Sequence, residues 1–124
     1  MKFKRTIWFL SDLHLEHWNC NKFCNRGFDT LEEMNQGIID SINGLVKENH
    51  TLYLLGDIIW STGDFTILNK INCKDIRLIR GNHDDSNYNK FLKNNIKLVC
   101  EEMIIKIGKT RVLLSHYPYR YGFW

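Results

Sequence analysis

Polar side chains with metal-binding chemistry follow four apolar runs of the sequence, each at the point where the run ends. They are Asp12 and His14 in "SDLH", Asp57 in "LLGD", Asn82, His83 and Asp84 in "GNHDD", and His116 in "LSHYP". Carboxylate and amide oxygens combined with imidazole nitrogens suit Mn, Fe, Zn or Ni better than Ca or Mg. Any one cluster alone is better explained by a cap, a turn or a buried hydrogen bond. Their repetition at four strand ends favours a shared metal site.

The spacing of Asp12 and His14 adds to this prediction. Residues two apart on an extended segment point to the same side of the chain. If the segment is extended, one carboxylate and one imidazole face a single ion together.

The apolar runs themselves predict an alternation of strands and helices. The expected strands are 5–10, 51–55, 75–80, 96–99, 103–107 and 110–115, and the expected helices are 31–45, 65–71 and 86–95. Residues 11–18 are expected to form a loop. Strand–helix alternation is typical of an α/β fold with a parallel sheet, and its ligand crevice lies at the carboxyl ends of the strands. Residues far apart in the sequence therefore meet at that edge.

Two local patterns fix the boundaries of the strongest elements. Thr30 and Glu33 stand in the spacing of a capping box, and apolar residues recur behind them at three- and four-residue intervals. Gly108 and Lys109 separate two strand-like runs and predict a two-residue hairpin turn. The hairpin adds antiparallel strands, so we expect mixed sheets.

Composition limits the classes of protein that remain. A length of 124 residues predicts one domain, spanning 1–124. The net charge of +3 permits an anionic substrate, but the basic residues are scattered and do not predict a nucleic-acid groove. No signal peptide or membrane span is recognisable, so a cytoplasmic protein that does not bind membranes is expected.

The motifs "SDLH", "LLGD", "GNHD" and "LSHYP", in this order and spacing, resemble the calcineurin-like metallophosphoesterase superfamily, and details look most like its small phage- and bacterial-type branch. The resemblance runs from the first strand to His116. It implies a β-sandwich of mixed sheets flanked by helices. It also implies hydrolysis of a phosphomonoester or phosphodiester by a hydroxide that bridges two divalent ions. Mn is the expected metal, with Fe, Zn or Ni as alternatives, and the substrate could be a nucleotide or nucleic acid.

The resemblance also implies a role for each motif residue. Asp12 and His14 would hold one ion, Asn82 and His116 would hold the second, and Asp57 would bridge both. His83 would donate a proton or hydrogen bond to the substrate, and Asp84 would orient His83. His17 and Arg26 are weaker predictions as substrate contacts: a plain surface role is equally compatible with the position of His17, and a solvated surface role is favoured for Arg26.

The sequence departs from the family pattern at one place. The family normally carries a Gly-His-x-His element after the "SHYP" motif, and this sequence has no histidine after His116. One hypothesis is therefore a metal-dependent phosphoesterase, either fully active or weakened. The alternative is a catalytically impaired relic that binds metal, phosphate or a protein. The missing element would also leave the edge of strand 110–115 unpaired, which predicts a tendency to form homo-oligomers.

Overall fold

The computed structural model describes residues 5–23, 26–80 and 87–117. Its helices and strands alternate along the chain up to a closing hairpin. The predicted residues Asn82, His83 and Asp84 lie outside the described residues. No helix in the described ranges is long and apolar enough to cross a membrane.

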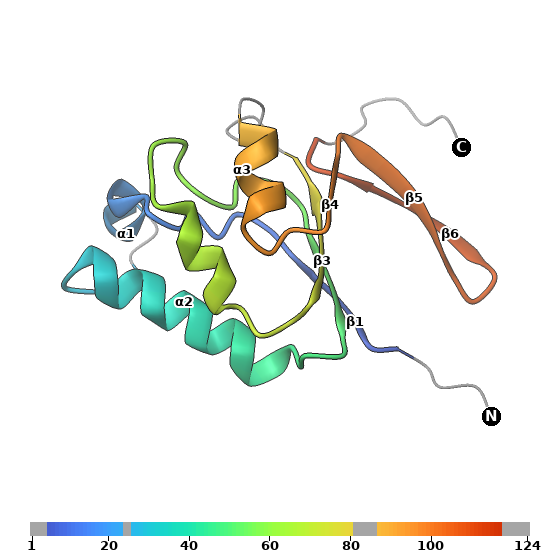
Figure 1. Cartoon of the computed structure of the whole chain (residues 1–124), viewed down its shortest axis with the longest axis horizontal. Coiled ribbons are helices and arrows are strands. Elements are labelled where there is room, and N and C mark those ends of the chain that lie inside the picture. The colour runs from blue at the N-terminus through green and yellow to red at the C-terminus, as the bar shows by residue number, and fades with distance from the viewer. Residues whose placement is uncertain (1–4, 24–25, 81–86, 118–124) are drawn as a thin grey trace.

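A four-stranded parallel sheet forms the centre of the fold (Figure 1). Its strands, in spatial order, are β1 (Ile7–Leu10), β2 (Thr51–Leu54), β3 (Asp75–Ile79) and β4 (Leu98–Cys100). All neighbouring strands are parallel, with Ile7 opposite Thr51 and Thr51 opposite Asp75. Every residue of β2 is buried, as expected for an inner strand covered on both faces.

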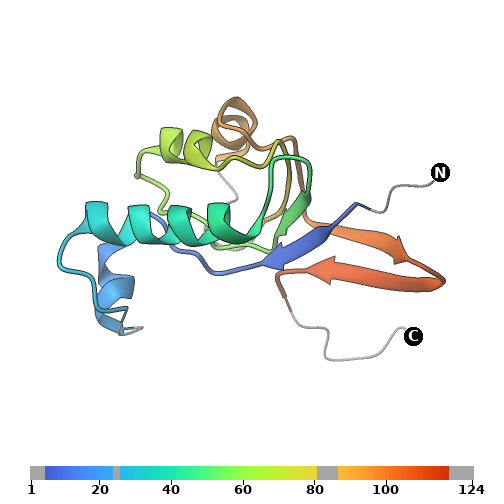
Figure 2. The same cartoon turned by 90° about the horizontal axis from the view of Figure 1, so that it is seen from below.

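Helices cover one face of this sheet (Figures 1 and 2). They are α2 (Leu31–Leu45), the 3₁₀ helix η1 (Phe65–Lys70) and α3 (Tyr88–Lys93). The short helix α1 (Trp18–Phe23) lies away from the sheet, near the N-terminal end of α2 (Figures 1 and 2). The core between helices and sheet is apolar and includes Leu15, Ile39, Ile42, Leu52, Leu54, Ile58, Leu68, Ile76, Leu78 and Phe91. Burial of these side chains is the main favourable contribution to folding.

The start of α2 follows the predicted capping pattern. The Thr30 hydroxyl accepts a hydrogen bond from the backbone N–H of Glu33 at 3.1 Å. The Glu33 carboxylate accepts from the backbone N–H of Asp29 at 3.3 Å, one residue before the position that a capping box would use. The cap therefore forms with a small shift in its second bond.

The hairpin of β5 (Glu102–Ile107) and β6 (Thr110–Ser115) packs on the opposite face of the sheet (Figure 2). Gly108 occupies the turn with φ of 59°, a conformation that glycine adopts without strain. Leu114 packs with Tyr53 and Ile79 of the parallel sheet. The layers therefore confirm the predicted α/β sandwich, with parallel and antiparallel pairs in separate sheets.

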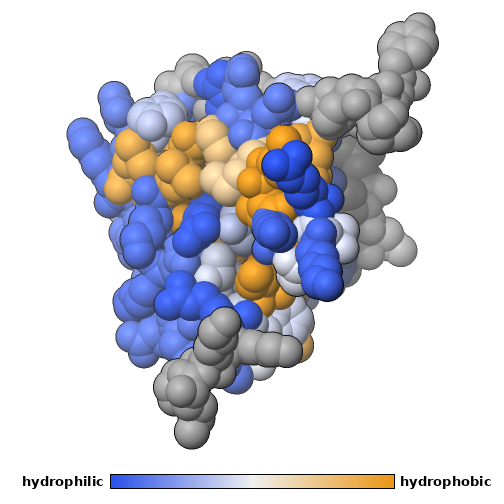
Figure 3. Space-filling view, turned by 90° about the vertical axis from the view of Figure 1, so that its right-hand side faces the viewer, coloured by the Kyte–Doolittle hydropathy of each residue, from blue (hydrophilic) through white to orange (hydrophobic). Residues whose placement is uncertain are grey.

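The hairpin end of the molecule keeps apolar surface exposed. Figure 3 views this end and shows hydrophobic residues gathered between hydrophilic ones. The exposed apolar residues of β1 and β5 are Ile7, Phe9, Ile104 and Ile107. Within the described residues, β6 pairs only with β5.

Three expectations about elements differ from the structure. The segment 11–18 is not all loop, because α1 begins at Trp18. Residues 65–70 form a 3₁₀ helix, which Asp64 caps by accepting from the backbone N–H of Thr66. The strand expected at 96–99 is β4, displaced toward the C-terminus.

Candidate metal centre

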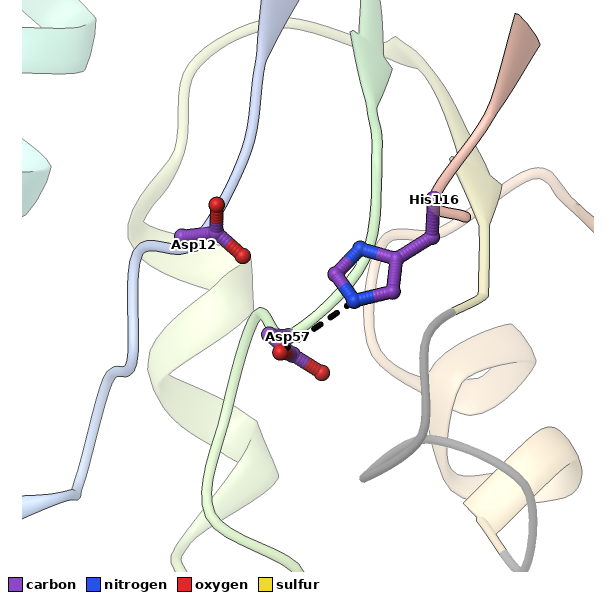
Figure 4. A group of neighbouring side chains, drawn as sticks. All are labelled: Asp12, Asp57 and His116. Carbon is purple, nitrogen blue, oxygen red and sulfur yellow. Dashed lines mark ion pairs between the residues drawn. The ribbon is translucent and has the colours of Figure 1, made fainter. Parts of the chain in front are cut away.

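Three of the predicted ligands converge at the carboxyl edge of the parallel sheet. Asp12 follows β1, Asp57 follows β2 and His116 follows β6. One ligand atom from each lies within 4.8 Å of the other two. Figure 4 shows the three side chains approaching one another from three separate segments. The prediction that distant motifs meet at this edge is therefore confirmed for these residues.

The segment that carries Asp12 and His14 is not extended. Asp12 and His14 have φ of 56° and 52°, in the left-handed region, and Asp57 has φ of 51°. The argument that both side chains point the same way along an extended strand was therefore wrong, because it assumed the wrong backbone conformation. Such conformations cost about 1–3 kcal/mol each and cluster at functional sites.

Hydrogen bonds between the two loops hold this strained backbone in place. The N–H of Asp12 donates to the carbonyl of Gly56, and the N–H of His14 donates to the carbonyl of Asp57, both at 3.1 Å. The N–H of Leu15 continues the ladder to the carbonyl of Ile58 at 2.8 Å. The loop after β1 is thus fixed against the loop after β2, which positions Asp12 beside Asp57.

His116 is oriented as a metal ligand. Its Nδ1 lies 2.7 Å from the backbone carbonyl oxygen of Leu55, which can only accept a hydrogen bond, so Nδ1 carries the hydrogen. In neutral imidazole this leaves the lone pair on Nε2. Nε2 lies 3.3 Å from Oδ2 of Asp57. A histidine that donates its other ring N–H to a carbonyl is the usual arrangement at protein metal sites.

The charges at the site favour a cation. When His116 is neutral, its Nε2 and Oδ2 of Asp57 are both acceptors, and at 3.3 Å they face each other without a hydrogen to share. Oδ1 of Asp57 is buried and makes no hydrogen bond within the described residues, although Asp57 itself contacts His116 through Oδ2. Buried polar atoms are normally satisfied. A divalent ion bound by Asp12, Asp57 and His116 would satisfy all of these atoms, so the donor set fits a metal.

His14 lies beside this group but outside its closest triad. Burial lowers the pKa of His14, and the nearby carboxylates of Asp57 and Asp12 act in the opposite direction. The neutral form favoured by this shift is the form that binds metals. Nδ1 of His14 lies 3.4 Å from Nδ1 of His17, so the two imidazoles touch. The assignment of His14 as a ligand stays a prediction.

Arg26 lies at the back of the loop that carries Asp12. Its guanidinium donates to the backbone carbonyls of Leu13 at 2.7 Å and Asp12 at 3.2 Å. These two bonds brace the left-handed segment from outside. A positioning role is therefore visible for Arg26, while its predicted contact with substrate stays untested.

Two features of the site were not predicted from the sequence. The carbonyl of Leu55 orients His116, and no side-chain pattern encodes a backbone contact between residues so far apart. Trp60 stacks on His17 with ring centroids 4.4 Å apart. The closeness of Trp60 to Asp57 in the sequence was the available signal for this second feature.

Comparisons with known proteins agree with this geometry. The calcineurin-like phosphoesterase family profile matches residues 5–120, so the chain belongs to that family. Membership of this family agrees with a site that holds divalent metal ions.

Two individual relatives are longer than this chain. An uncharacterised protein of Methanocaldococcus jannaschii, MJ1445, is 40% identical over an alignment of 84 residues that covers 64% of this chain and 47% of the relative. The crystal structure of AQ665 from Aquifex aeolicus, a protein of unknown function, matches 93% of this chain and 62% of its own at 28% identity with a TM-score of 0.74. The chain thus spans about half the length of the curated relative that it matches.

Proposed function

We propose that this protein is a hydrolase that cleaves a phosphomonoester or phosphodiester at a dinuclear centre of divalent ions, with Mn²⁺ as the working metal. The observation that carries the proposal is the convergence of Asp12, Asp57 and His116 at the sheet edge. Membership of the calcineurin-like phosphoesterase family supports the reaction class.

The proposed ligands divide into two groups. Asp12, Asp57 and His116 are close enough to share an ion. His14 beside them and Asn82 in the "GNHD" motif would add one ligand each, and with Asp57 shared by both ions each ion would have three ligands from the named residues. When bound, the ions lower the pKa of the attacking water and neutralise charge on the phosphate oxygens.

The chain's own contribution is orientation and proton transfer. The Leu55 carbonyl holds the Nε2 lone pair of His116 toward Asp57. The braced loop holds Asp12 at the same place before any ligand arrives. His83 is proposed to protonate the leaving oxygen, and Asp84 to orient His83; their places in the motif support these roles.

The test is hydrolysis of p-nitrophenyl phosphate and bis(p-nitrophenyl) phosphate with added Mn²⁺ or Ni²⁺ and, in parallel, with a chelator. We expect turnover with metal that Asp57→Asn abolishes while the variant remains folded. Asp40→Asn, which changes an exposed carboxylate on α2, is the matched control and should keep the wild-type rate. Turnover that is equal in Asp57→Asn and wild type would contradict the proposal.

A further inference from the structure

A ladder of backbone hydrogen bonds carries aromatic rings beside the metal centre. The loops after β1 and β2 are joined by a parallel bridge between Leu15 and Ile59. The N–H of Trp60 donates to the carbonyl of Leu15 at 2.9 Å. Leu15 and Ile59 are fully or almost fully buried, so Trp60 extends from a fixed base.

The rings form a continuous series that starts next to Asp57. The centroids of His14 and His17 are 5.4 Å apart in a tilted arrangement. The centroids of His17 and Trp60 are 4.4 Å apart, with 25° between their planes, which is a stacked arrangement. Although one face of its indole lies on His17, Trp60 keeps 40% of its surface exposed.

Exposure alone does not mark Trp60 as a binding residue, because single exposed apolar residues are ordinary. The position of Trp60 at the end of the ring series does. Two ring-to-ring steps separate the exposed indole from His14, which lies beside Asp57 and Asp12. The exposed indole of Trp60 is therefore joined through His17 to the residues beside the metal centre.

We propose that Trp60, supported by His17, is a stacking platform for a flat aromatic ring on the organic part of the substrate, such as a nucleobase. The inference rests on the proposed function, because it places the phosphate at the metal centre. It narrows the substrate to phosphoesters of nucleosides or similar aromatic alcohols. Stacking has little base preference, since every base has a π-face, so the platform predicts nucleotide binding without strong discrimination among bases.

The platform is tested by binding, without turnover. The probes are a phosphonate analogue of adenosine monophosphate, in which carbon replaces the ester oxygen, and methylphosphonate, which has no ring. Calorimetry on the Mn²⁺-loaded full chain gives Kd for both. The variants are Trp60→Ala, Trp60→Leu and Trp60→Phe, and the control is Leu45→Ala, which alters an exposed apolar residue on α2.

We expect wild type to bind the adenosine phosphonate more tightly than methylphosphonate. Trp60→Ala and Trp60→Leu should weaken the adenosine probe by about 5- to 150-fold, as loss of one stacked base does, and change methylphosphonate less than twofold. Trp60→Phe should retain most of the affinity, and Leu45→Ala all of it. Trp60→Leu keeps apolar volume, so it separates loss of stacking from loss of packing.

Three results would overturn the platform. One is failure of wild type to prefer the adenosine probe. Another is equally weakened binding of both probes by the Trp60 variants, with or without metal loss. That result would mean that Trp60 supports the metal centre and does not bind the ring. The third is a ratio of the affinities for the adenosine phosphonate and methylphosphonate that is the same in Trp60→Leu as in wild type. Since no probe is cleaved, absence of hydrolysis would count against the proposed function alone.

Discussion

Nε2 of His116 and Oδ2 of Asp57 lie 3.3 Å apart while Nδ1 of His116 donates to the carbonyl of Leu55. Two hydrogen-bond acceptors therefore face each other in neutral His116. The arrangement is unfavourable in the protein alone and becomes favourable when a cation lies between the two atoms. With His116 in its neutral form, the metal-free protein therefore carries the electrostatic cost of a site built for an ion.

This cost predicts the behaviour of Asp57→Asn without metal. The amide of the variant can donate a hydrogen bond to Nε2 of His116, and asparagine tolerates the left-handed conformation at this position. In a chelator at pH 8, above the range in which imidazole normally titrates, the variant should melt at or above the wild-type temperature. A large fall in the melting temperature would show that Asp57 and His116 form a stabilising ion pair instead.

His83→Ala should separate catalysis from metal binding. General acid catalysis contributes about 10²–10⁴-fold in rate. The variant should lose rate in this range and keep its bound metal, whereas His116→Ala should lose both. Metal content measured by mass spectrometry beside the dye assay checks this. Equal metal loss in the two variants would mean that His83 is a ligand.

Replacing either of the two glycines of α2 by alanine should change the free energy of unfolding, and the two changes should have opposite signs. A Cβ on Gly37 would lie 2.7 Å from Cε1 and 2.8 Å from Cζ of Phe28, whereas a Cβ on Gly44 meets nothing within 4 Å. Asn21 ties down the backbone of Phe28 through two hydrogen bonds, so the ring alone must move. Gly37→Ala should lower the free energy of unfolding by about 1 kcal/mol, and Gly44→Ala should raise it by about 0.5 kcal/mol.

Urea denaturation of both glycine variants gives the two values. Each variant serves as the control for the other, since both gain the same helix propensity. Stabilisation by Gly37→Ala equal to that of Gly44→Ala would show that Phe28 moves away without cost.

A buried carboxylate at the other end of the sheet should control acid stability. Asp75 is 6% exposed and accepts hydrogen bonds from Arg5, Thr51 and Arg77 at 2.8–3.2 Å. Burial alone would raise its pKa, but the hydrogen bonds from Arg77 and Thr51 and the charge of Arg77 outweigh it, so the pKa of Asp75 is lowered. Its stabilising contribution is therefore present above the pKa of an unfolded aspartate and is lost as the pH falls through the lower folded pKa.

Asp75→Asn should lower the free energy of unfolding at pH 7 by about 2–4 kcal/mol, because two arginines lose a buried partner. The deficit should begin to shrink as the pH falls below about 4, the ordinary pKa of an unfolded aspartate, and should keep shrinking down to the lower pKa of folded Asp75. Urea denaturation at several pH values measures this. A deficit that is constant from pH 7 to pH 3 would assign the effect to packing.

The sheet and its ligand edge could be predicted from the sequence, and the backbone of the site could not. β2 is buried at every position and consists of β-branched, aromatic and aliphatic residues, and α2 has a regular apolar repeat, so both patterns are local. The left-handed conformations of Asp12 and His14 depend on hydrogen bonds to the loop after β2. Helix α1 has six residues and no apolar repeat that would distinguish it from a loop.

The most direct test of the account is calorimetric titration of Mn²⁺ into the metal-free protein and into Asp57→Asn, with Asp40→Asn as the control. The account predicts Mn²⁺ binding by wild type and Asp40→Asn. It predicts at least about 100-fold weaker binding by Asp57→Asn, since loss of mere supporting contacts already costs 10–100-fold. Binding of Mn²⁺ to Asp57→Asn with wild-type affinity would contradict the claim that Asp57 and His116 form a metal centre.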